Sequence, residues 1–227
     1  MGVGPLAVYL AQLGFRVTGE DDAPGGEMRA VLSQAGVVVG PMPDACELVV
    51  YSSAIAKTHP LYRAAVDRGL PLVRRGELLA EVVRDRKLIA VCGSHGKTTT
   101  TAMIVSALRA VSFPAGYVLG GLFADDTPPA RAGSNEWVVA EVDESDGTIE
   151  RFTPEITVAV NLDWDHADYY RQPAEIEATF AALFVRTRGA VLVSDACAMS
   201  ARVSSAGVPP AFPNQPAGRP RYQSFGR

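Results

Sequence analysis

One short segment, Gly-Ser-His-Gly-Lys-Thr-Thr-Thr at residues 93–100, constrains the fold more than any other part of the sequence. It follows an apolar run at residues 87–92 that is typical of a buried strand, and it precedes a helical pattern at residues 101–108. A glycine-rich turn between a strand and a helix, ending in Lys-Thr, is the arrangement of a phosphate-binding loop. Glycine lets successive N–H groups point at an anion, and the helix N-terminus adds partial positive charge. The segment therefore predicts a nucleotide site on an α/β sheet.

The same pattern assigns roles to two side chains of the loop. Lys97 is placed to reach the outer phosphates of a nucleotide, and the Thr98 hydroxyl is placed to bind Mg²⁺. The loop departs from the strict pattern, which has glycine at the position of Val91, whereas the additional glycine here is Gly93. The plainer interpretation, a glycine turn with an exposed lysine, does not account for a strand and a helix on its two sides.

Two further predicted strands end in polar residues. The run at residues 137–142 leads into Asp-Glu-Ser-Asp at 143–146, and the run at 156–160 leads into a segment that contains His166. Ligands of open α/β sheets bind at the carboxyl ends of strands, so we expect the three strand ends to meet at one Mg-nucleotide site. The alternatives are a solvated acidic loop and a structural histidine, and neither explains why both follow buried strands.

The N-terminal part, residues 1–85, predicts a second α/β unit. A glycine turn with Gly2 and Gly4 precedes a helix, and the short strand after this helix ends at Glu20 and Asp21. This order is the second half of a Rossmann βαβ unit, whose first strand is expected to be missing. Strands and helices alternate through the rest of the unit, which predicts a parallel sheet. The charged stretch that follows is expected to act as a hinge into the second unit.

Composition excludes several classes of protein. A chain of 227 residues suits two domains of modest size, and a net charge of −4 leaves no basic surplus for binding nucleic acid. No apolar run approaches the roughly 20 residues that span a bilayer, so no membrane insertion is expected. The 3 cysteines lack pairing or metal-type spacing, which favours reduced thiols in a cytoplasmic protein.

Several stretches together resemble a known family. The loop at residues 93–100, the acidic segment at 143–147 and the Asp-His pair at 165–166 resemble the ATP-dependent Mur ligases of bacterial peptidoglycan synthesis. The stretches at 51–55 and 73–81, with the histidine of the loop, are similar to the branch of the family that joins L-alanine to UDP-N-acetylmuramate. The resemblance runs along nearly the whole chain.

The resemblance implies an α/β fold in two parts. Residues 1–85 are expected to form a Rossmann-like UDP-sugar-binding domain with its first strand missing, and residues 86–227 a central ATP-binding domain that is incomplete at its C-terminus. The C-terminal ligase domain of the family is expected to be absent. The isolated chain is therefore expected to bind nucleotide weakly and not to ligate, and its oligomeric state is not predicted.

The chemistry implied by the resemblance is ATP-driven amide formation. ATP phosphorylates the carboxylate of UDP-N-acetylmuramate, and the amine of L-alanine attacks the resulting acyl phosphate. The implied catalytic residues are Lys97, Glu144 and His166, and the implied Mg²⁺ ligands are Thr98, Glu144 and His166. The implied nucleotide-binding residues are Gly93, Ser94, His95, Gly96, Lys97, Thr98, Thr99 and Asn161. The implied UDP-sugar-binding residues are Gly2, Gly4, Glu20, Asp21, Ser52 and Ser53.

Alternative functions stay open at this point. One is the relative that attaches a tripeptide to the same UDP-sugar, although that relative tends to have tyrosine at the position of Ser145. Another is a non-catalytic nucleotide-binding remnant. A dinucleotide-dependent oxidoreductase is suggested only by the N-terminal glycine turn, and a P-loop GTPase lacks a separate guanine-recognition motif here.

Overall fold

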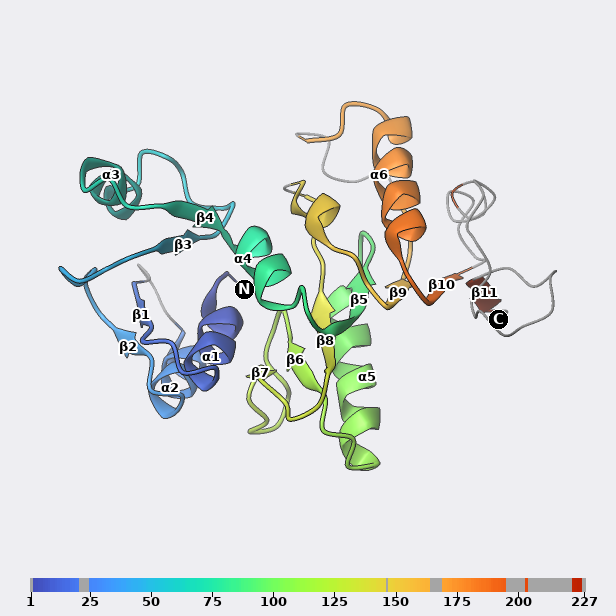
Figure 1. Cartoon of the computed structure of the whole chain (residues 1–227), viewed down its shortest axis with the longest axis horizontal. Helices are drawn as coiled ribbons and strands as arrows, with labels where there is room; N and C mark the ends of the chain where they lie inside the picture. Colours follow the sequence, from blue (N-terminus) through green and yellow to red (C-terminus); the bar gives the residue numbers. More distant parts are fainter. Residues whose placement is uncertain are drawn as a thin grey trace.

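The computed structural model describes residues 2–20, 25–145, 147–163 and 169–194, together with Val203 and the backbone of residues 222–225. Figure 1 shows the chain as a large sheet with helices on it and a smaller N-terminal part beside it. The α/β class predicted from the sequence is confirmed. In the described ranges, no helix has both the length and the apolar character needed to cross a membrane.

A seven-stranded sheet organises the chain from residue 87 onward, in the order β11-β10-β9-β5-β8-β6-β7. Its strands are β5 (Lys87–Cys92), β6 (Gly116–Val118), β7 (Ala130–Arg131), β8 (Trp137–Glu141), β9 (Ile156–Ala159), β10 (Ala190–Ser194) and β11 (Tyr222–Phe225). Neighbours are parallel except β6 and β7. β5 lies between β8 and β9, so the three strand ends that the sequence predicts to meet are adjacent.

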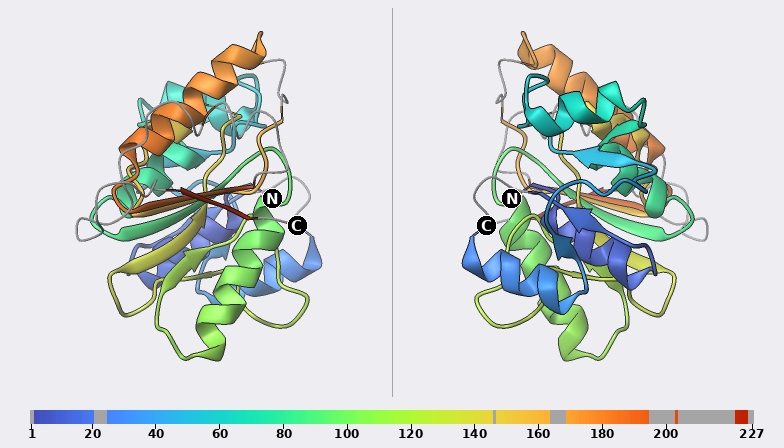
Figure 2. Two further views of the ribbon diagram at one scale, coloured as in Figure 1. Left: turned by 90° about the vertical axis from the view of Figure 1, so that its right-hand side faces the viewer. Right: turned by 90° about the vertical axis from the view of Figure 1, so that its left-hand side faces the viewer.

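Helices cover both faces of this sheet. Helix α5 (Lys97–Ala110) lies on one face and α6 (Pro173–Arg186) on the other, and the short helix η1 (Thr148–Arg151) precedes β9 (Figure 2). Side chains of a strand alternate between its faces. Ala90 and Cys92 therefore join the core cluster that contains Phe180 of α6, whereas Val91 packs with Val105 of α5. Burial on both faces explains the continuous apolar run of β5.

The N-terminal part contains the predicted alternation of helices and strands but not a single sheet. Its elements are α1 (Gly4–Gln12), β1 (Thr18–Gly19), α2 (Gly26–Gln34), β2 (Val38–Val39), β3 (Val49–Tyr51), α3 (Pro60–Asp67), β4 (Leu72–Arg74) and α4 (Arg75–Val82). β1 pairs only with β2, and β3 only with β4, both in parallel. No strand among the described residues lies between the pairs to carry backbone hydrogen bonds from one to the other.

Arg86 fixes the junction between the two parts, where the sequence suggested a hinge. Its guanidinium donates hydrogen bonds to the carbonyl oxygens of Ala132 at 3.2 Å, Asn135 at 2.6 Å and Trp137 at 3.2 Å. It also reaches the hydroxyl oxygen of Tyr9 in α1 at 3.4 Å. The planar guanidinium thus ties α1 to the loop before β8 and to β8 itself.

Gln12, the last residue of α1, makes a second connection. Its carboxamide accepts a hydrogen bond from the N–H of Ala132 at 2.9 Å and donates to the carbonyl oxygen of Ala130 at 3.5 Å. Ala130 belongs to β7, which is the last strand on its side of the sheet. The N-terminal part therefore packs against the edge of the seven-stranded sheet.

Candidate nucleotide-binding site

The predicted phosphate-binding loop joins β5 to α5 at the carboxyl edge of the large sheet. Gly93 has a φ of +123° and Gly96, the residue before α5, a φ of +81°. Both values lie where side chains are disfavoured. A Cβ atom on Gly93 would also collide with the carbonyl oxygen of Asn161. The loop conformation therefore depends on glycine at residue 93 for two separate reasons.

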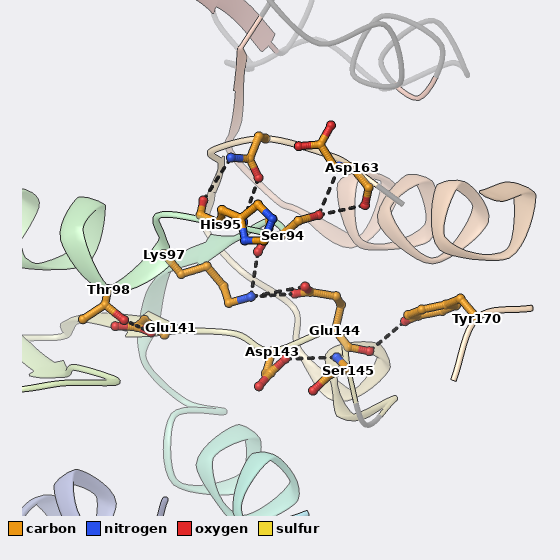
Figure 3. A network of polar contacts seen from close by, with 12 residues as sticks. Ser94, His95, Lys97, Thr98, Glu141, Asp143, Glu144, Ser145, Asp163 and Tyr170 are labelled. Carbon is orange, nitrogen blue, oxygen red and sulfur yellow. Dashed lines mark hydrogen bonds and ion pairs between the residues drawn. The ribbon is translucent and has the colours of Figure 1, made fainter. Parts of the chain in front are cut away.

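Residues after β9 hold the loop from the side. The Ser94 hydroxyl donates to the carbonyl oxygen of Asp163 at 2.8 Å and accepts from the N–H of Asp163 at 3.0 Å (Figure 3). The carboxamide of Asn161 accepts from the N–H of His95 at 2.9 Å and donates to its carbonyl oxygen at 3.1 Å. Asn161, which the resemblance assigns to nucleotide binding, thus braces the main chain of the loop.

Lys97 lies at the start of α5 and reaches back across the loop. Its Nζ donates to the carbonyl oxygen of Gly93 at 2.7 Å and lies 3.2 Å from each carboxylate oxygen of Glu144. The Glu144 side chain is fully buried. Burial raises the pKa of the Glu144 carboxyl above its usual range, although the charge of Lys97 acts in the opposite direction. The structure therefore pairs two of the predicted catalytic residues with each other.

Thr98 contacts a different carboxylate, which the sequence analysis did not select. Its hydroxyl donates to Oε2 of Glu141 at 3.1 Å, and Oε1 of Glu141 accepts from the N–H of Gly120 at 2.6 Å. Glu141 is only 6% exposed. A hydroxyl and a carboxylate side by side are the hard oxygen donors that Mg²⁺ prefers. Thr98 and Glu141 are therefore two oxygen donors that could hold Mg²⁺, whereas the carboxylate of Glu144, the predicted ligand, is paired with Lys97.

The rest of the predicted metal set is not covered by the structure. His166 and Asp165 lie outside the described residues, so the role assigned to His166 remains a prediction. Within the described ranges, no cluster of three or more His, Cys, Asp or Glu side chains has the arrangement of a metal site.

Two hydrogen bonds fix the backbone around Glu144. The N–H of Ser145 donates to Oδ1 of Asp143 at 3.0 Å. Burial acts to raise the pKa of Asp143, but the hydrogen bonds from Ser145 and the positive charges of Lys97 and Arg75 act together in the opposite direction, and the pKa is lowered overall. The hydroxyl of Tyr170 donates to the carbonyl oxygen of Glu144 at 2.8 Å, and burial raises the pKa of Tyr170 to about 12. Tyr170 therefore remains a hydrogen-bond donor at neutral pH. No motif marked it in the sequence.

The predicted UDP-sugar residues lie in the N-terminal part and are less buried. A Cβ added to Gly2 would lie 3.6 Å from Cβ of Ser52, so these two residues are neighbours. The Ser52 hydroxyl accepts from the N–H of Ala54 at 3.3 Å. Ser53 and Glu20 are exposed.

Gly4 and Asp21 complete the set of residues predicted to bind the UDP-sugar. Gly4 begins α1 and faces Met28, whose Sδ would lie 2.9 Å from an added Cβ. Asp21 lies outside the described residues. Among the described residues of this set, Gly2 and Ser52 are therefore shown to be neighbours.

Comparison with protein-family models gives two matches that cover most of the chain. A model described as Mur ligase family, catalytic domain, matches residues 1–87. A model described as Mur ligase middle domain matches residues 91–208 and includes the loop, Glu141 and Glu144.

Curated relatives carry the name UDP-N-acetylmuramate--L-alanine ligase. The protein from Bartonella henselae is 40% identical over 185 residues, which are 79% of this chain and 39% of that protein. The protein from Agrobacterium fabrum is 39% identical over 184 residues, again 79% of this chain and 39% of that protein. The chain thus spans 39% of the length of these relatives.

Solved structures share the fold. UDP-N-acetylmuramate:L-alanyl-gamma-D-glutamyl-meso-diaminopimelate ligase from Neisseria meningitides matches with a TM-score of 0.78 and 24% identity, over 91% of this chain and 73% of that chain. UDP-N-acetylmuramate-alanine ligase MurC from Thermotoga maritima matches with a TM-score of 0.77 and 24% identity, over 89% and 49% of the two chains. At this identity the likeness establishes the arrangement of strands and helices alone.

Proposed function

The chain belongs to the Mur ligase family, and from this premise we propose that it carries the ATP-binding and UDP-sugar-binding parts of a ligase that joins L-alanine to UDP-N-acetylmuramate. The main observation that supports the proposal is the geometry of the loop, in which Lys97 contacts Gly93 and the Thr98–Glu141 pair lies next to it. The names of the curated relatives support the choice of substrates. We place the reaction in the cytoplasm. We assign ATP binding to the unit at residues 86–227 and UDP-sugar binding to the unit at residues 1–85.

In this proposal the loop binds the phosphates of ATP. Its N–H groups and the N-terminus of α5 face the anion, and Lys97 contributes the positive charge. Thr98 and Glu141 hold Mg²⁺, and His166 remains the predicted ligand for a second ion. Bound Mg²⁺ supplies neutralisation of phosphate charge and polarisation of the transferred phosphoryl group. Asn161 and Ser94 keep the loop in register with the end of β9, which preserves the orientation of the N–H groups.

The other substrate binds, in this proposal, at the N-terminal part. The start of α1 with Gly2 and Gly4 offers N–H groups to a diphosphate, and Ser52 and Ser53 add hydroxyl donors. Glu20 lies at the end of β1, where an acid can accept a hydrogen bond from a nucleoside hydroxyl. Ser145 favours the L-alanine branch over the tripeptide branch, which tends to have tyrosine at that position.

Calorimetry with Mg-ATP tests the nucleotide assignment. The chain is expected to bind Mg-ATP weakly, and Lys97→Ala is expected to weaken this binding further, by roughly 100-fold, because it removes a charge-assisted contact to phosphate. Lys87→Ala is the matched control, since Lys87 lies at the opposite end of β5 and pairs with Glu136. A folded chain that does not bind Mg-ATP, or a Lys97→Ala variant that binds as the parent does, would refute the assignment.

Titration with UDP-N-acetylmuramate tests the second half of the proposal. Binding is expected for the parent chain and for Lys97→Ala, because the sugar nucleotide contacts residues of the N-terminal part. NAD serves as the comparison ligand, since an oxidoreductase of the Rossmann class would bind NAD instead. Binding of NAD with no binding of the UDP-sugar contradicts the proposal.

A further inference from the structure

Lys97 is already engaged by acceptors of its own chain. Its ammonium donates to the carbonyl oxygen of Gly93 at 2.7 Å and to the carboxylate of Glu144, with 3.2 Å to each oxygen. An ammonium has three donors, and these contacts use most of them. A phosphate that binds Lys97 must therefore compete with a carboxylate for the same protons.

The side chains of Lys97 and Glu144 are both shielded from water, which strengthens their interaction. The side chain of Lys97 is 16% exposed and that of Glu144 is 0% exposed. Water screens such a pair weakly, so the carboxylate cancels much of the positive charge that attracts a phosphate. The chain offers a contrast in Lys87 and Glu136, which lie 2.6 Å apart with side chains 43% and 59% exposed. An exposed pair of this kind is screened and contributes little.

The backbone of Glu144 is held in place beneath its carboxylate. The hydroxyl of Tyr170, a residue only 3% exposed, donates to the carbonyl oxygen of Glu144 at 2.8 Å. On the other side, the N–H of Ser145 bonds to Asp143 at 3.0 Å. Figure 3 shows Tyr170, Glu144 and Lys97 in line from the segment before α6 to the phosphate-binding loop. The carboxylate is thus presented to Lys97 from a fixed position.

We propose that Glu144 is an internal counter-ion that competes with the bound nucleotide for Lys97, and that Tyr170 is a positioning residue that holds Glu144 in this role. The identity of the nucleotide as ATP rests on the function proposed above. The consequence concerns affinity and selectivity. A ligand binds well only when its phosphate charge outweighs that of the carboxylate, which favours a polyphosphate over a monophosphate.

Calorimetry with Mg-ATP on the parent chain and four variants tests the competition. Glu144→Gln keeps the shape of the side chain and removes its charge, and it is expected to tighten Mg-ATP binding roughly tenfold. Tyr170→Phe removes only the hydroxyl and is expected to tighten binding about two- to threefold, because the neutral hydrogen bond to the carbonyl oxygen of Glu144 is lost. In the double variant, Tyr170→Phe is expected to add nothing, because the carboxylate it positions has lost its charge. Glu136→Gln removes the partner of the exposed lysine and is expected to leave binding unchanged.

Weaker or unchanged binding in Glu144→Gln contradicts the proposal, because it would show that Glu144 supports the nucleotide or is indifferent to it. Additive effects of the two substitutions refute the positioning role of Tyr170. If Glu144→Gln does not fold, as judged by circular dichroism, Tyr170→Phe alone still decides, since the proposal requires it to tighten binding.

A second readout needs no nucleotide. Acetylation of Lys97 by acetic anhydride, followed by mass spectrometry with Lys87 as internal reference, is expected to be several times faster in Glu144→Gln than in the parent. An unchanged rate refutes the counter-ion whatever the binding data show. A faster rate in a chain that does not bind Mg-ATP keeps the counter-ion and overturns the ATP assignment instead.

Discussion

The two parts of the chain share an alternation of strands and helices, yet they are packed very differently. In the large sheet, four of the six residues of β5 and four of the five residues of β8 are buried. In the N-terminal part, β1, β3 and β4 contain no buried residue. A central parallel strand is covered on both faces and paired on both edges, whereas an isolated pair of short strands is not. The same sequence pattern therefore gives different local stability, depending on how many strands join the sheet.

The two predicted binding sites differ in the same way as the parts that contain them. In the predicted ATP site, Ser94, Lys97 and Thr98 are each hydrogen-bonded to a residue more than 40 positions away in the sequence. Glu20 and Ser53 of the predicted UDP-sugar site are exposed at the surface of the less packed part. Precise chemistry depends on side chains that a rigid scaffold holds in place. The phosphate-binding loop is therefore preorganised to a greater degree than the predicted sugar-nucleotide site.

The largest change in the free energy of unfolding is expected from truncating a core side chain, and doing so in each part tests the difference in packing. Phe180→Ala in α6 removes a fully buried ring and is expected to lower the free energy of unfolding by about 3–5 kcal/mol. Leu32→Ala in α2, where the leucine is 9% exposed, is expected to cost about 2 kcal/mol because the surroundings can relax. Urea denaturation followed by circular dichroism measures both. Equal losses would show that the two parts are equally well packed.

A smaller effect is expected at the junction. Arg86→Lys replaces a guanidinium that donates to several carbonyl oxygens with an ammonium that cannot span them, and a loss of about 1–3 kcal/mol is expected. Arg84→Lys is the matched control, because Arg84 is exposed and pairs only with Glu81 among the interactions described for it. The same denaturation experiment, with hydrogen exchange of the α1 amides, gives the result. If Arg86→Lys leaves α1 as protected as before, the junction does not depend on the guanidinium.

The smallest effect concerns Glu77, which links α4 to η1. Its carboxylate accepts hydrogen bonds from the N–H of Arg74 at 3.0 Å and from the guanidinium of Arg74 at 3.1 Å, and Arg151 lies 2.8 Å away. The side-chain hydrogen bond from Arg74 lowers the pKa of Glu77 below its usual value, against the opposing effect of burial. This stabilisation is present above the pKa of an unfolded glutamate and is lost as the pH falls through the lower folded value.

Glu77→Gln is therefore expected to cost about 1 kcal/mol at pH 7 and progressively less below about pH 4. Urea denaturation at a series of pH values measures the difference from the parent chain. Glu81→Gln, which alters an exposed pair on the same helix, is expected to show a flat difference. A constant cost of Glu77→Gln across the series contradicts the charged interaction.

Much of this architecture follows from local pattern, and the limits of the prediction are physical. The run at residues 87–92 predicts β5 to the residue, because an apolar segment between a charged stretch and a glycine turn has few alternatives. Helix α5 begins at Lys97, earlier than its apolar pattern, since the loop itself provides the first turn. Adjacent placement of the three strand ends also follows from the rule for parallel sheets.

The contacts within the site could not be predicted in the same way. Glu141 lies in a strand of apolar residues, and its partner Thr98 is 43 positions away, so only the pairing of β5 with β8 brings them together. Its charge within a buried strand was the available signal. Tyr170 belongs to no motif, and its contact with Glu144 depends on the path of the chain before α6. Long-range side-chain partners are set by packing, which a periodic pattern does not encode.

The carboxamide of Gln12 has one consequence beyond the joining of two parts. It carries the same donor and acceptor as a peptide group, and it meets the backbone of residues 130 and 132 in the way a neighbouring strand would. An unprotected strand margin is a template on which a second molecule can add its own strand. In this chain a single side chain from α1 occupies that template. A form of the protein that kept the large sheet but lost α1 would expose it and become prone to self-association.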